Sequence, residues 1–574
     1  MPQEVSNLQI YHRRGQVLEE ELYSHSTLGE ARITHDNRSK PPATPINADR
    51  LDLLLKVTNY NTELRLKLYN GFKKGFDIGF RGIPNSEIVE NVQNLSNEKT
   101  QAIDDAIRKE LENKRISGPF TKIPFNVFQI NPISVVAKKS GGYRMITNLS
   151  SPAGSSINDG ICDVFARVSY ASLDTAINLI LEAGQNPFLA KSDIKSAFRL
   201  IPIDSAQYHL LCFEWKGLYY FDACLPMGAR SSCAIFESFS TALEHILSCK
   251  GVQLSCHYLD DFLFVGSSER ECEKHLSKFR EICTYTNVPI AEEKTFGPSQ
   301  KLEFLGFFID TIEQSVSLPI DKINKGVEEI SELLKLKKCT LKRLQQTLGF
   351  LNFTTTVIIP GRAFLVRLYR LTSKVSRPYH KVRLSKSVKE DLKLWLIFLN
   401  QYNGKLLYTE QLFKSGNAVE IFTDASKNFG FAAVFGRLWF NGVWPCEWWK
   451  SQNIFLLELI PIVLAFFTWG NILANKCVVL WVDNEALVSV LNKQSSTDDQ
   501  VMFLIRKLVL FSLIHNINFR ANHILGKLNV LADSLSRGNL DNFFANSPIA
   551  EPLPVKIPQL PSCLSLKQQF SFCI

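Results

Sequence analysis

The sequence predicts a multidomain α/β protein in which a basic helical segment separates two regions of alternating strands and helices. Residues 116–318 alternate strand-like and helix-like periodicity, residues 319–410 are mainly helical, and residues 418–537 return to alternation. A chain of 574 residues has room for about three to five domains. Its hydrophobic content of 45% and aromatic content of 11% are typical of globular proteins.

The two ends of the chain differ from this pattern. We expect residues 1–45 to be disordered, because they are polar and show no sustained period. Residues 46–115 carry helical patterns and predict a helical N-terminal extension. Residues 538–574 include five prolines between Pro548 and Pro561, which predicts a linker or extended arm.

Positive charge is concentrated in the helical segment. The net charge is +9, yet residues 321–390 alone hold 16 Lys and Arg against 5 Asp and Glu, an excess of 16 − 5 = +11. A polyanion such as nucleic acid is the partner that this excess favours, and a solvated helical face is the alternative. We expect helices at 323–336, 340–353, 363–371 and 385–399.

Cysteine usage and hydropathy bear on location. The 13 cysteines include no C-x-x-C pair, so neither a zinc site nor a disulfide framework is indicated, and we expect an intracellular protein, cytoplasmic or nuclear and not secreted. Residues 454–473 are apolar and nearly long enough to span a bilayer. Because they include Glu458 and Pro461 and lack basic flanks, we expect a buried helix and no membrane, with a membrane anchor as the alternative.

Two adjacent carboxylates form the most informative motif. Asp260 and Asp261 lie between the apolar runs 254–259 and 262–265, which predicts a β-hairpin with an acidic tip. Neighbouring carboxylates repel each other unless a cation holds them, and Mg²⁺ prefers such hard oxygen ligands. A solvated turn is the alternative interpretation. Asp193 also ends a predicted strand, where a helix N-cap is the simpler role.

The ordered motifs resemble the palm of a reverse transcriptase. The order is Asp193, Phe198, Leu-Pro-Met-Gly at 225–228, Tyr-Leu-Asp-Asp at 258–261, Lys294 and Phe-Leu-Gly at 304–306. Residues 132–144 resemble the fingers hairpin of the same family, and the resemblance runs from about 125 to 310. Asn148 stands where many relatives have Asp, and Met227 where many have Gln or Phe.

The resemblance implies a right-hand polymerase with fingers, a palm built on an antiparallel sheet, and a helical thumb. It implies that Asp193 and Asp260, supported by Asp261, hold two Mg²⁺ (or Mn²⁺) ions. The other residues that it implies are dNTP contacts: Lys139 (with Lys138 as a competitor) and Arg144 on the triphosphate, Phe198 under the sugar, Met227 and Gly228 beside the nucleotide, and Lys294 at the leaving group. Surface solvation is the alternative for each lysine.

A second set of acids follows residue 418. Asp424 and Asp483 end apolar strands, Glu458 lies on the apolar helix, and Asp533 follows His523 by ten residues. A buried glutamate needs a cation or a partner. This set resembles the ribonuclease H fold, which implies that the four acids bind two further metal ions and that His523 assists near the product.

Together these features predict a reverse transcriptase with ribonuclease H activity, whose partners are an RNA template, a DNA primer, an RNA–DNA hybrid and dNTPs. The basic helices would form a thumb, with Lys342 and Arg343 as phosphate contacts; no oligomeric state is predicted. The palm motifs and the segment 71–80 most resemble DIRS-type retroelements, with retrovirus-like and pararetrovirus-like enzymes as alternatives. The rival hypothesis is a domesticated, catalytically silent nucleic-acid-binding protein.

Overall fold

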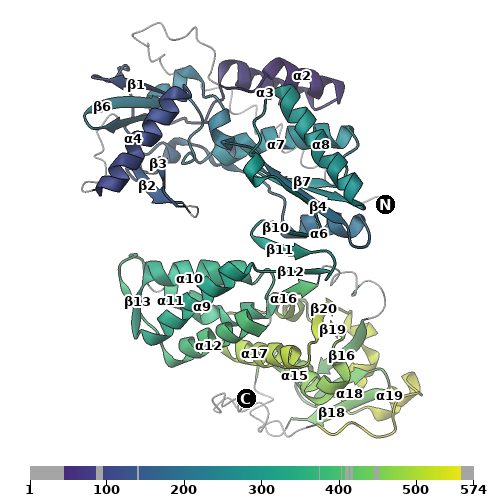
Figure 1. Cartoon of the computed structure of the whole chain (residues 1–574). Helices are drawn as coiled ribbons and strands as arrows, with labels where there is room; N and C mark the ends of the chain where they lie inside the picture. Colours follow the sequence, from purple (N-terminus) through teal and green to yellow (C-terminus); the bar gives the residue numbers. More distant parts are fainter. Residues whose placement is uncertain are drawn as a thin grey trace. The chain divides into compact units, whose positions relative to one another are not determined.

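A computed structural model describes residues 44–85, 95–138, 141–373, 375–401, 404–406, 413, 418–444 and 452–557. The chain divides into two compact units, one of residues 1–179 with 189–298 and the other of 180–188 with 299–574 (Figure 1). The predicted fold class is confirmed: antiparallel sheets with fingers and palm character precede a helical segment and a further α/β domain. The sequence predicts disorder over residues 1–45, and residues 1–43 of this range lie outside the described residues.

The palm sheet is the centre of the first unit. Its strands follow the order β7-β8-β4-β9. The helices α7 and α8 pack against β7 and β8 and against each other. Their bounds are β4 Phe188–Asp193, β7 Ser255–Tyr258, β8 Asp261–Gly266, β9 Phe296–Ser299, α7 Ser232–Cys249 and α8 Glu269–Thr286.

A second sheet, β1-β6-β5, and the hairpin β2-β3 form the fingers side of this unit. Helix α4 covers both through an apolar cluster that includes Ile103, Ile107 and Phe213. The bounds are α4 Asn97–Glu112, β1 Ile116–Phe120, β2 Ile133–Ala137, β3 Tyr143–Thr147, β5 Cys212–Trp215 and β6 Leu218–Asp222, with the short helices α5 Asp163–Ala166 and α6 Leu173–Glu182 between β3 and β4.

The predicted helical extension is present and packs on the palm. Helices α2 (Ala48–Val57) and α3 (Thr62–Lys74) contact each other, and α2 also contacts α7 and α8 (Figure 1). The Phe72 ring on α3 lies 5.2 Å from the Phe239 ring on α7, in an edge-to-face arrangement. Both rings are buried, so the extension is part of the core of this unit.

The second unit begins with the sheet β10-β11-β12-β15 and the basic helices. Helix α9 packs against α10 and α12, and a two-stranded ribbon, β13-β14, joins this bundle. The bounds are β10 Lys301–Phe304, β11 Phe307–Asp310, β12 Ser315–Ser317, α9 Ile320–Lys335, β13 Lys338–Thr340, α10 Leu341–Thr354, α11 Val366–Thr372, β14 Lys381–Arg383, α12 Lys386–Gln401 and β15 Lys405–Leu406.

The C-terminal α/β domain is built on the five-stranded sheet β18-β17-β16-β19-β20, in which β16, β19 and β20 run parallel. Side chains alternate between the faces of a strand. On β17, Ala432 and Val434 pack with Leu535 of α18, while Phe435 contacts Trp469 of α15, so helices cover both faces. The bounds are β16 Val419–Ala425, β17 Gly430–Phe435, β18 Leu438–Val443, α15 Ile454–Leu473, β19 Cys477–Val482, α16 Glu485–Lys493, α17 Asp499–Ile514, β20 Asn518–His523, α18 Val530–Ser536 and α19 Leu540–Asn546.

Helix α15 is the segment whose composition resembles a membrane span. It is long and apolar enough to cross a bilayer, yet 78% of its 18-residue window is buried inside the domain. It packs on α17, β16 and β17. This is the environment of a core helix, as the sequence predicts for a segment that carries Glu458.

Part of the segment 538–574, for which the sequence predicts a linker or extended arm, is helical and packs on the domain. Residues 540–546 form helix α19, and Phe543 is fully buried against Trp439. Farther along, the Val555 backbone N–H donates to the carbonyl of Trp439 at 2.8 Å. The apolar pair Phe543–Phe544 docks this segment despite the prolines that follow it; residues 558–574 lie outside the described residues.

Candidate active sites

Three carboxylates of the first unit converge where β4 ends and the β7-β8 hairpin turns. Asp193 is the last residue of β4 and is 7% exposed. Asp260 lies in the hairpin turn, and Asp261 is the first residue of β8. The backbone N–H of Ile194 donates to the carbonyl oxygen of Asp260 at 3.0 Å, which holds the turn against the end of β4.

The electrostatics show that these acids share one small volume. Burial, and to a smaller extent the charges of Asp193 and Asp261, raise the pKa of Asp260 to about 6. Lys294 Nζ lies 2.8 Å from Asp193 Oδ2. Burial alone would lower the pKa of Lys294, but Asp193 and then Asp260 and Asp261 reverse that effect and raise it. Lys294 therefore lies at the predicted place, as a charged amine among the three carboxylates.

The residues present fit a divalent cation. A hard cation stabilises like charges that are gathered at a strand end. In the structure the Lys294 amine provides a positive charge beside these carboxylates. Within the described ranges, no three carboxylate, imidazole or thiol groups are already arranged as a metal cage.

The fingers hairpin and the Leu-Pro-Met-Gly loop lie together. Arg144 on β3 is exposed, and its Nη1 lies 3.8 Å from Met227 Sδ. A Cβ on Gly228 would lie 2.5 Å from the carbonyl oxygen of Thr147, so only glycine allows this loop to approach β3. Arg144, Met227 and Gly228 are thus brought together as predicted, whereas Lys139 lies outside the described residues.

Phe198 has both a buried and an open side. It follows the end of β4 on a short 3₁₀ helix, and its ring lies 5.4 Å from that of Phe236, which is fully buried. Phe198 itself is half-buried. The ring is therefore anchored on the palm core while part of its surface stays accessible beside the site.

The four acids of the C-terminal domain also converge. Burial, and to a smaller extent the charges of Asp483 and Asp533, raise the pKa of Asp424 to about 6. Burial, and to a smaller extent the charges of Asp483 and Asp424, raise the pKa of Glu458 to about 7. These charge effects show that Asp424 is near Asp483 and Asp533 and that Glu458 is near Asp483 and Asp424; the four acids come from β16, the residue after β19, and helices α15 and α18.

One oxygen in this second site fits the role of a metal ligand. Glu458 Oε2 is buried and has no hydrogen-bond partner among the described residues. An unpaired buried carboxylate oxygen is costly, so it fits a metal ligand. His523 lies at the end of β20, where its Nε2 is 3.3 Å from the carbonyl oxygen of Asp483, close to the acids as predicted.

The sequence did not identify two supporting residues. Ser536 donates a hydrogen bond to Asp424 Oδ2, and Arg537 Nε donates to Asp533 Oδ1 at 2.7 Å. Arg537 lies four residues after Asp533 on one helical face, a spacing that could have indicated the pair. The contact of Ser536 with a strand more than a hundred residues away has no local sequence signal.

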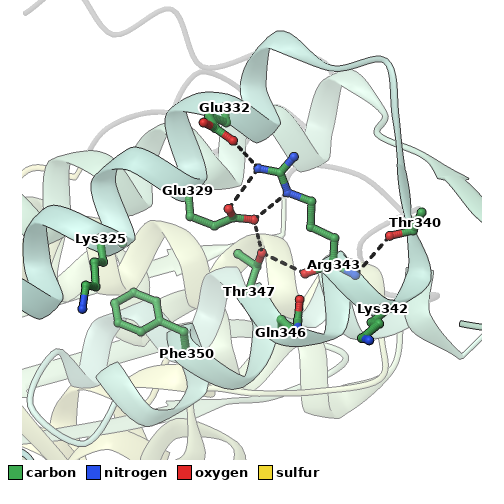
Figure 2. Close-up of a pocket in the computed structure, with 10 residues that line it drawn as sticks. Lys325, Glu329, Glu332, Thr340, Lys342, Arg343, Gln346, Thr347 and Phe350 are labelled. Atoms are coloured by element: carbon green, nitrogen blue, oxygen red, sulfur yellow. Dashed lines mark hydrogen bonds and ion pairs between the residues drawn. The ribbon is translucent and has the colours of Figure 1, made fainter. Parts of the chain in front are cut away.

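The structure places Arg343, a predicted phosphate contact, in a network of ion pairs. Its guanidinium donates to Glu329 through Nε and Nη2, at 2.8 and 2.9 Å, and to Glu332 through Nη2 at 2.5 Å (Figure 2). Arg343 therefore joins α10 to α9 beside a groove of about 520 Å³, and its charge is already neutralised. Lys342 is exposed at the same groove and stays a predicted phosphate contact.

The β13-β14 ribbon is a stronger candidate than Arg343 for a surface that binds phosphates. Lys338 pairs with Arg383 across the ribbon and Thr340 with Lys381, while Cys339 and Val382 are buried on the opposite face. The three basic side chains are exposed, and none makes an ion pair within the part of the chain that the structure describes. Like charges facing each other destabilise a sheet. A polyanion bound to this face would offset that repulsion.

Comparisons with known proteins agree with the palm geometry. Residues 136–309 match the family model described as reverse transcriptase (RNA-dependent DNA polymerase). The chain is 25% identical over 392 residues to a putative enzymatic polyprotein of Cassava vein mosaic virus, covering 64% of this chain and 54% of the relative. It is 22% identical over 468 residues to the transposon Tf2-3 polyprotein of Schizosaccharomyces pombe, covering 76% and 31%.

The chain thus spans about half of the first of these relatives and a third of the second. Among solved structures, it is similar to a foamy viral protease-reverse transcriptase in complex with double-stranded DNA, at 16% identity and a TM-score of 0.47, covering 88% of this chain and 85% of the other. The matched residues 136–309 contain Asp193, Asp260, Asp261 and Lys294. Residues 136–309 therefore match the reverse transcriptase family model, within a chain that is similar to a viral and a transposon polyprotein.

Proposed function

We propose that the chain is an RNA-directed DNA polymerase with ribonuclease H activity that serves the replication of a retroelement. One observation carries the polymerase assignment. The segment that matches the reverse transcriptase family holds Asp193, Asp260 and Asp261 at one strand end, where Asp260 is half-buried with a raised pKa and the amine of Lys294 lies 2.8 Å from Asp193. A structural role alone would leave three like charges in one place without benefit.

Two Mg²⁺ or Mn²⁺ ions held by Asp193 and Asp260, with support from Asp261, would supply Lewis acidity for DNA synthesis from dNTPs. The residues of the chain do the remaining work. Arg144 presents a guanidinium to the triphosphate, and the close packing of Gly228 on β3 fixes the loop on which Met227 stands. Lys294 holds a proton beside the carboxylates, where it can be given to a leaving group.

The second proposed activity is cleavage of the RNA strand of an RNA–DNA hybrid. It is supported by the convergence of Asp424, Glu458, Asp483 and Asp533 and by the unpaired Glu458 oxygen. His523 stands at the edge of this site. A polymerase that copies RNA produces such a hybrid, so the two activities serve one process.

We also propose how nucleic acid binds, which retroelement class the chain resembles and where the protein is located. RNA template, DNA primer and hybrid would meet the β13-β14 ribbon through their phosphates, in a salt-dependent and sequence-independent way. The sequence motifs support a relationship to DIRS-type retroelements, and the cysteine pattern supports an intracellular location.

The deciding experiment is primer extension on an RNA template with Mg²⁺ or Mn²⁺, read alongside hybrid cleavage. Asp260→Asn should reduce extension by ~100-fold or more and spare cleavage, because removal of a metal ligand typically costs several kcal/mol of transition-state stabilisation. Asp483→Asn should do the reverse. Glu273→Gln on α8 and Asp541→Asn on α19 are matched controls, since both side chains are exposed and neither is among the groups that shift the pKa of Asp260, Asp424 or Glu458.

The rival hypothesis of a silent nucleic-acid-binding protein makes a different prediction. Such a protein would bind duplexes as tightly as the wild type in every variant and show neither activity. If one carboxylate substitution abolished both activities in a folded protein, the assignment of two separate sites would be wrong.

A further inference from the structure

The hairpin turn that carries Asp260 contains a residue in an unfavourable backbone conformation. Leu259, which precedes Asp260, has φ +55°. A residue with a Cβ is strained in this left-handed region. Asp260 can hold its place only if contacts outside the turn fix this conformation, and two contacts do so. One is the Ile194 bond to the Asp260 carbonyl; the other reaches the backbone N–H of Leu259.

The second contact comes from helix α7. Glu237 Oε2 accepts the backbone N–H of Leu259 at 3.3 Å. Glu237 is 8% exposed, and a carboxylate so buried needs compensation. His257 provides it: Nε2 of the imidazole lies 3.2 Å from Glu237 Oε1. That separation is an ion-pair distance without the angle of a hydrogen bond, since Nε2 makes none within the described chain.

The imidazole is itself held from two further sides. His257 Nδ1 is hydrogen bonded to Glu244, which lies two helical turns after Glu237 on the same face of α7. The ring of His257 stacks on that of Phe262, its partner across the hairpin, at 5.2 Å. Burial alone would lower the pKa of His257, but Glu237 and Glu244 outweigh it and raise the pKa to about 9.

We infer that Glu237, held by His257 and Glu244, is a positioning residue that fixes the Leu259–Asp260 turn and so sets the place of the Asp260 carboxylate. The inference rests on the proposed polymerase function for its catalytic consequence. Its structural part, a chain of contacts from Glu244 through His257 and Glu237 to the Leu259 N–H, is independent of any activity.

Amide hydrogen exchange tests the structural part. In the full chain, a peptide spanning 255–264 should exchange at least ~10-fold faster in Glu237→Ala than in the wild type, because this variant lacks the bond that protects the Leu259 N–H. Glu237→Gln retains a carbonyl acceptor and should stay close to the wild type. Ser240→Ala is the matched control, since Ser240 is fully buried on α7 between Glu237 and Glu244 and its hydroxyl bonds to no described residue.

Kinetics test the functional part. Glu237→Ala should lower kcat for nucleotide incorporation ~10- to 100-fold while KM for dNTP and the duplex Kd change less than ~3-fold, because binding groups stay in place and the metal ligand does not. Glu237→Gln should restore most of kcat, and hybrid cleavage should be unchanged in both variants.

Exchange of the 255–264 peptide at the wild-type rate in Glu237→Ala would overturn the inference, whether or not the protein polymerises DNA. Equal losses in extension and hybrid cleavage would also overturn it, since they indicate general destabilisation. A wild-type protein that extends no primer would refute the proposed function, and the exchange result would still decide the role of Glu237.

Discussion

Arg506 on α17 donates a hydrogen bond to Asp391 on α12, with Nη2 3.2 Å from Oδ2. The two residues are 5% and 2% exposed. Arg367 also donates to Asp391, at 3.0 Å, and Arg506 Nε donates to the carbonyl of Ala363. The basic helical segment and the C-terminal α/β domain are thus joined by a buried, fully bonded ion pair within one unit.

Removal of one partner should destabilise this unit strongly. Arg506→Met leaves Asp391 buried with only Arg367, and breaking a buried pair costs about 3–5 kcal/mol. Only Trp215 of the 8 tryptophans belongs to the first unit, so 8 − 1 = 7 tryptophans belong to this one. Chemical unfolding followed by tryptophan fluorescence therefore reports mainly on this unit. Arg370→Met is the control: Arg370 pairs with the exposed Asp499, so its removal should cost below about 1 kcal/mol. Equal costs would contradict the role of burial.

Substitution of Phe198 should relax sugar selection. A half-buried ring beside the Asp193 strand end can exclude a 2′-hydroxyl by shape, so Phe198→Ala should reduce discrimination against ribonucleotides ~10- to 100-fold, or about 1.4–2.7 kcal/mol. Incorporation of both nucleotides and the melting temperature are measured together. Phe236→Leu, which perturbs the same aromatic pair in the core, should lower the melting temperature and leave discrimination intact. A destabilised Phe198→Ala protein with unchanged discrimination would mean that Phe198 is only a core residue.

The ribbon should account for part of the salt dependence of duplex binding. Lys338→Gln, Lys381→Gln and Arg383→Gln together should weaken binding to any sequence and flatten the salt dependence by roughly one unit of slope for each phosphate that is no longer neutralised. Fluorescence anisotropy over a salt series measures both. Arg343→Gln should leave the slope unchanged, because Glu329 and Glu332 already neutralise that charge. The reverse result would restore Arg343 as the phosphate-binding residue.

The stability contributed by His257 should depend on pH in a defined direction. Its pKa in the folded protein is raised to about 9, so the stabilisation is complete below the ordinary value near 6.5 and is lost as pH rises through 9. The difference in free energy of unfolding between wild type and His257→Gln should therefore shrink by roughly 1–3 kcal/mol between pH 7 and pH 10. Glu281 is exposed on α8, so Glu281→Gln is the control for a general change of stability at alkaline pH. A difference independent of pH would show that His257 is neutral in the fold.

The sequence predicted those parts of the fold and sites that depend on local patterns. Asp193, Asp424 and Asp483 can be located from the sequence because each lies at the end of an apolar strand, and the single acid Glu458 indicates that its apolar helix is core. The ion pair of Arg343 has no such signal, because its partner Glu329 lies on another helix and no local spacing indicates the pair. The same holds for Glu237 and His257, which meet only when α7 packs behind the hairpin.

Packing of α2 and α3 on the palm has a practical consequence for shortened versions of the chain. The family motifs begin near residue 125, which invites a start just before β1. Such a start would uncover the palm surface that Leu51, Leu55, Leu68 and Phe72 now bury, and it would remove the bond from Thr44 to the carbonyl of Leu200. Exposed apolar area of that kind promotes aggregation. The smallest well-behaved fragment of the first unit should therefore begin before residue 44, about eighty residues upstream of the recognisable motifs.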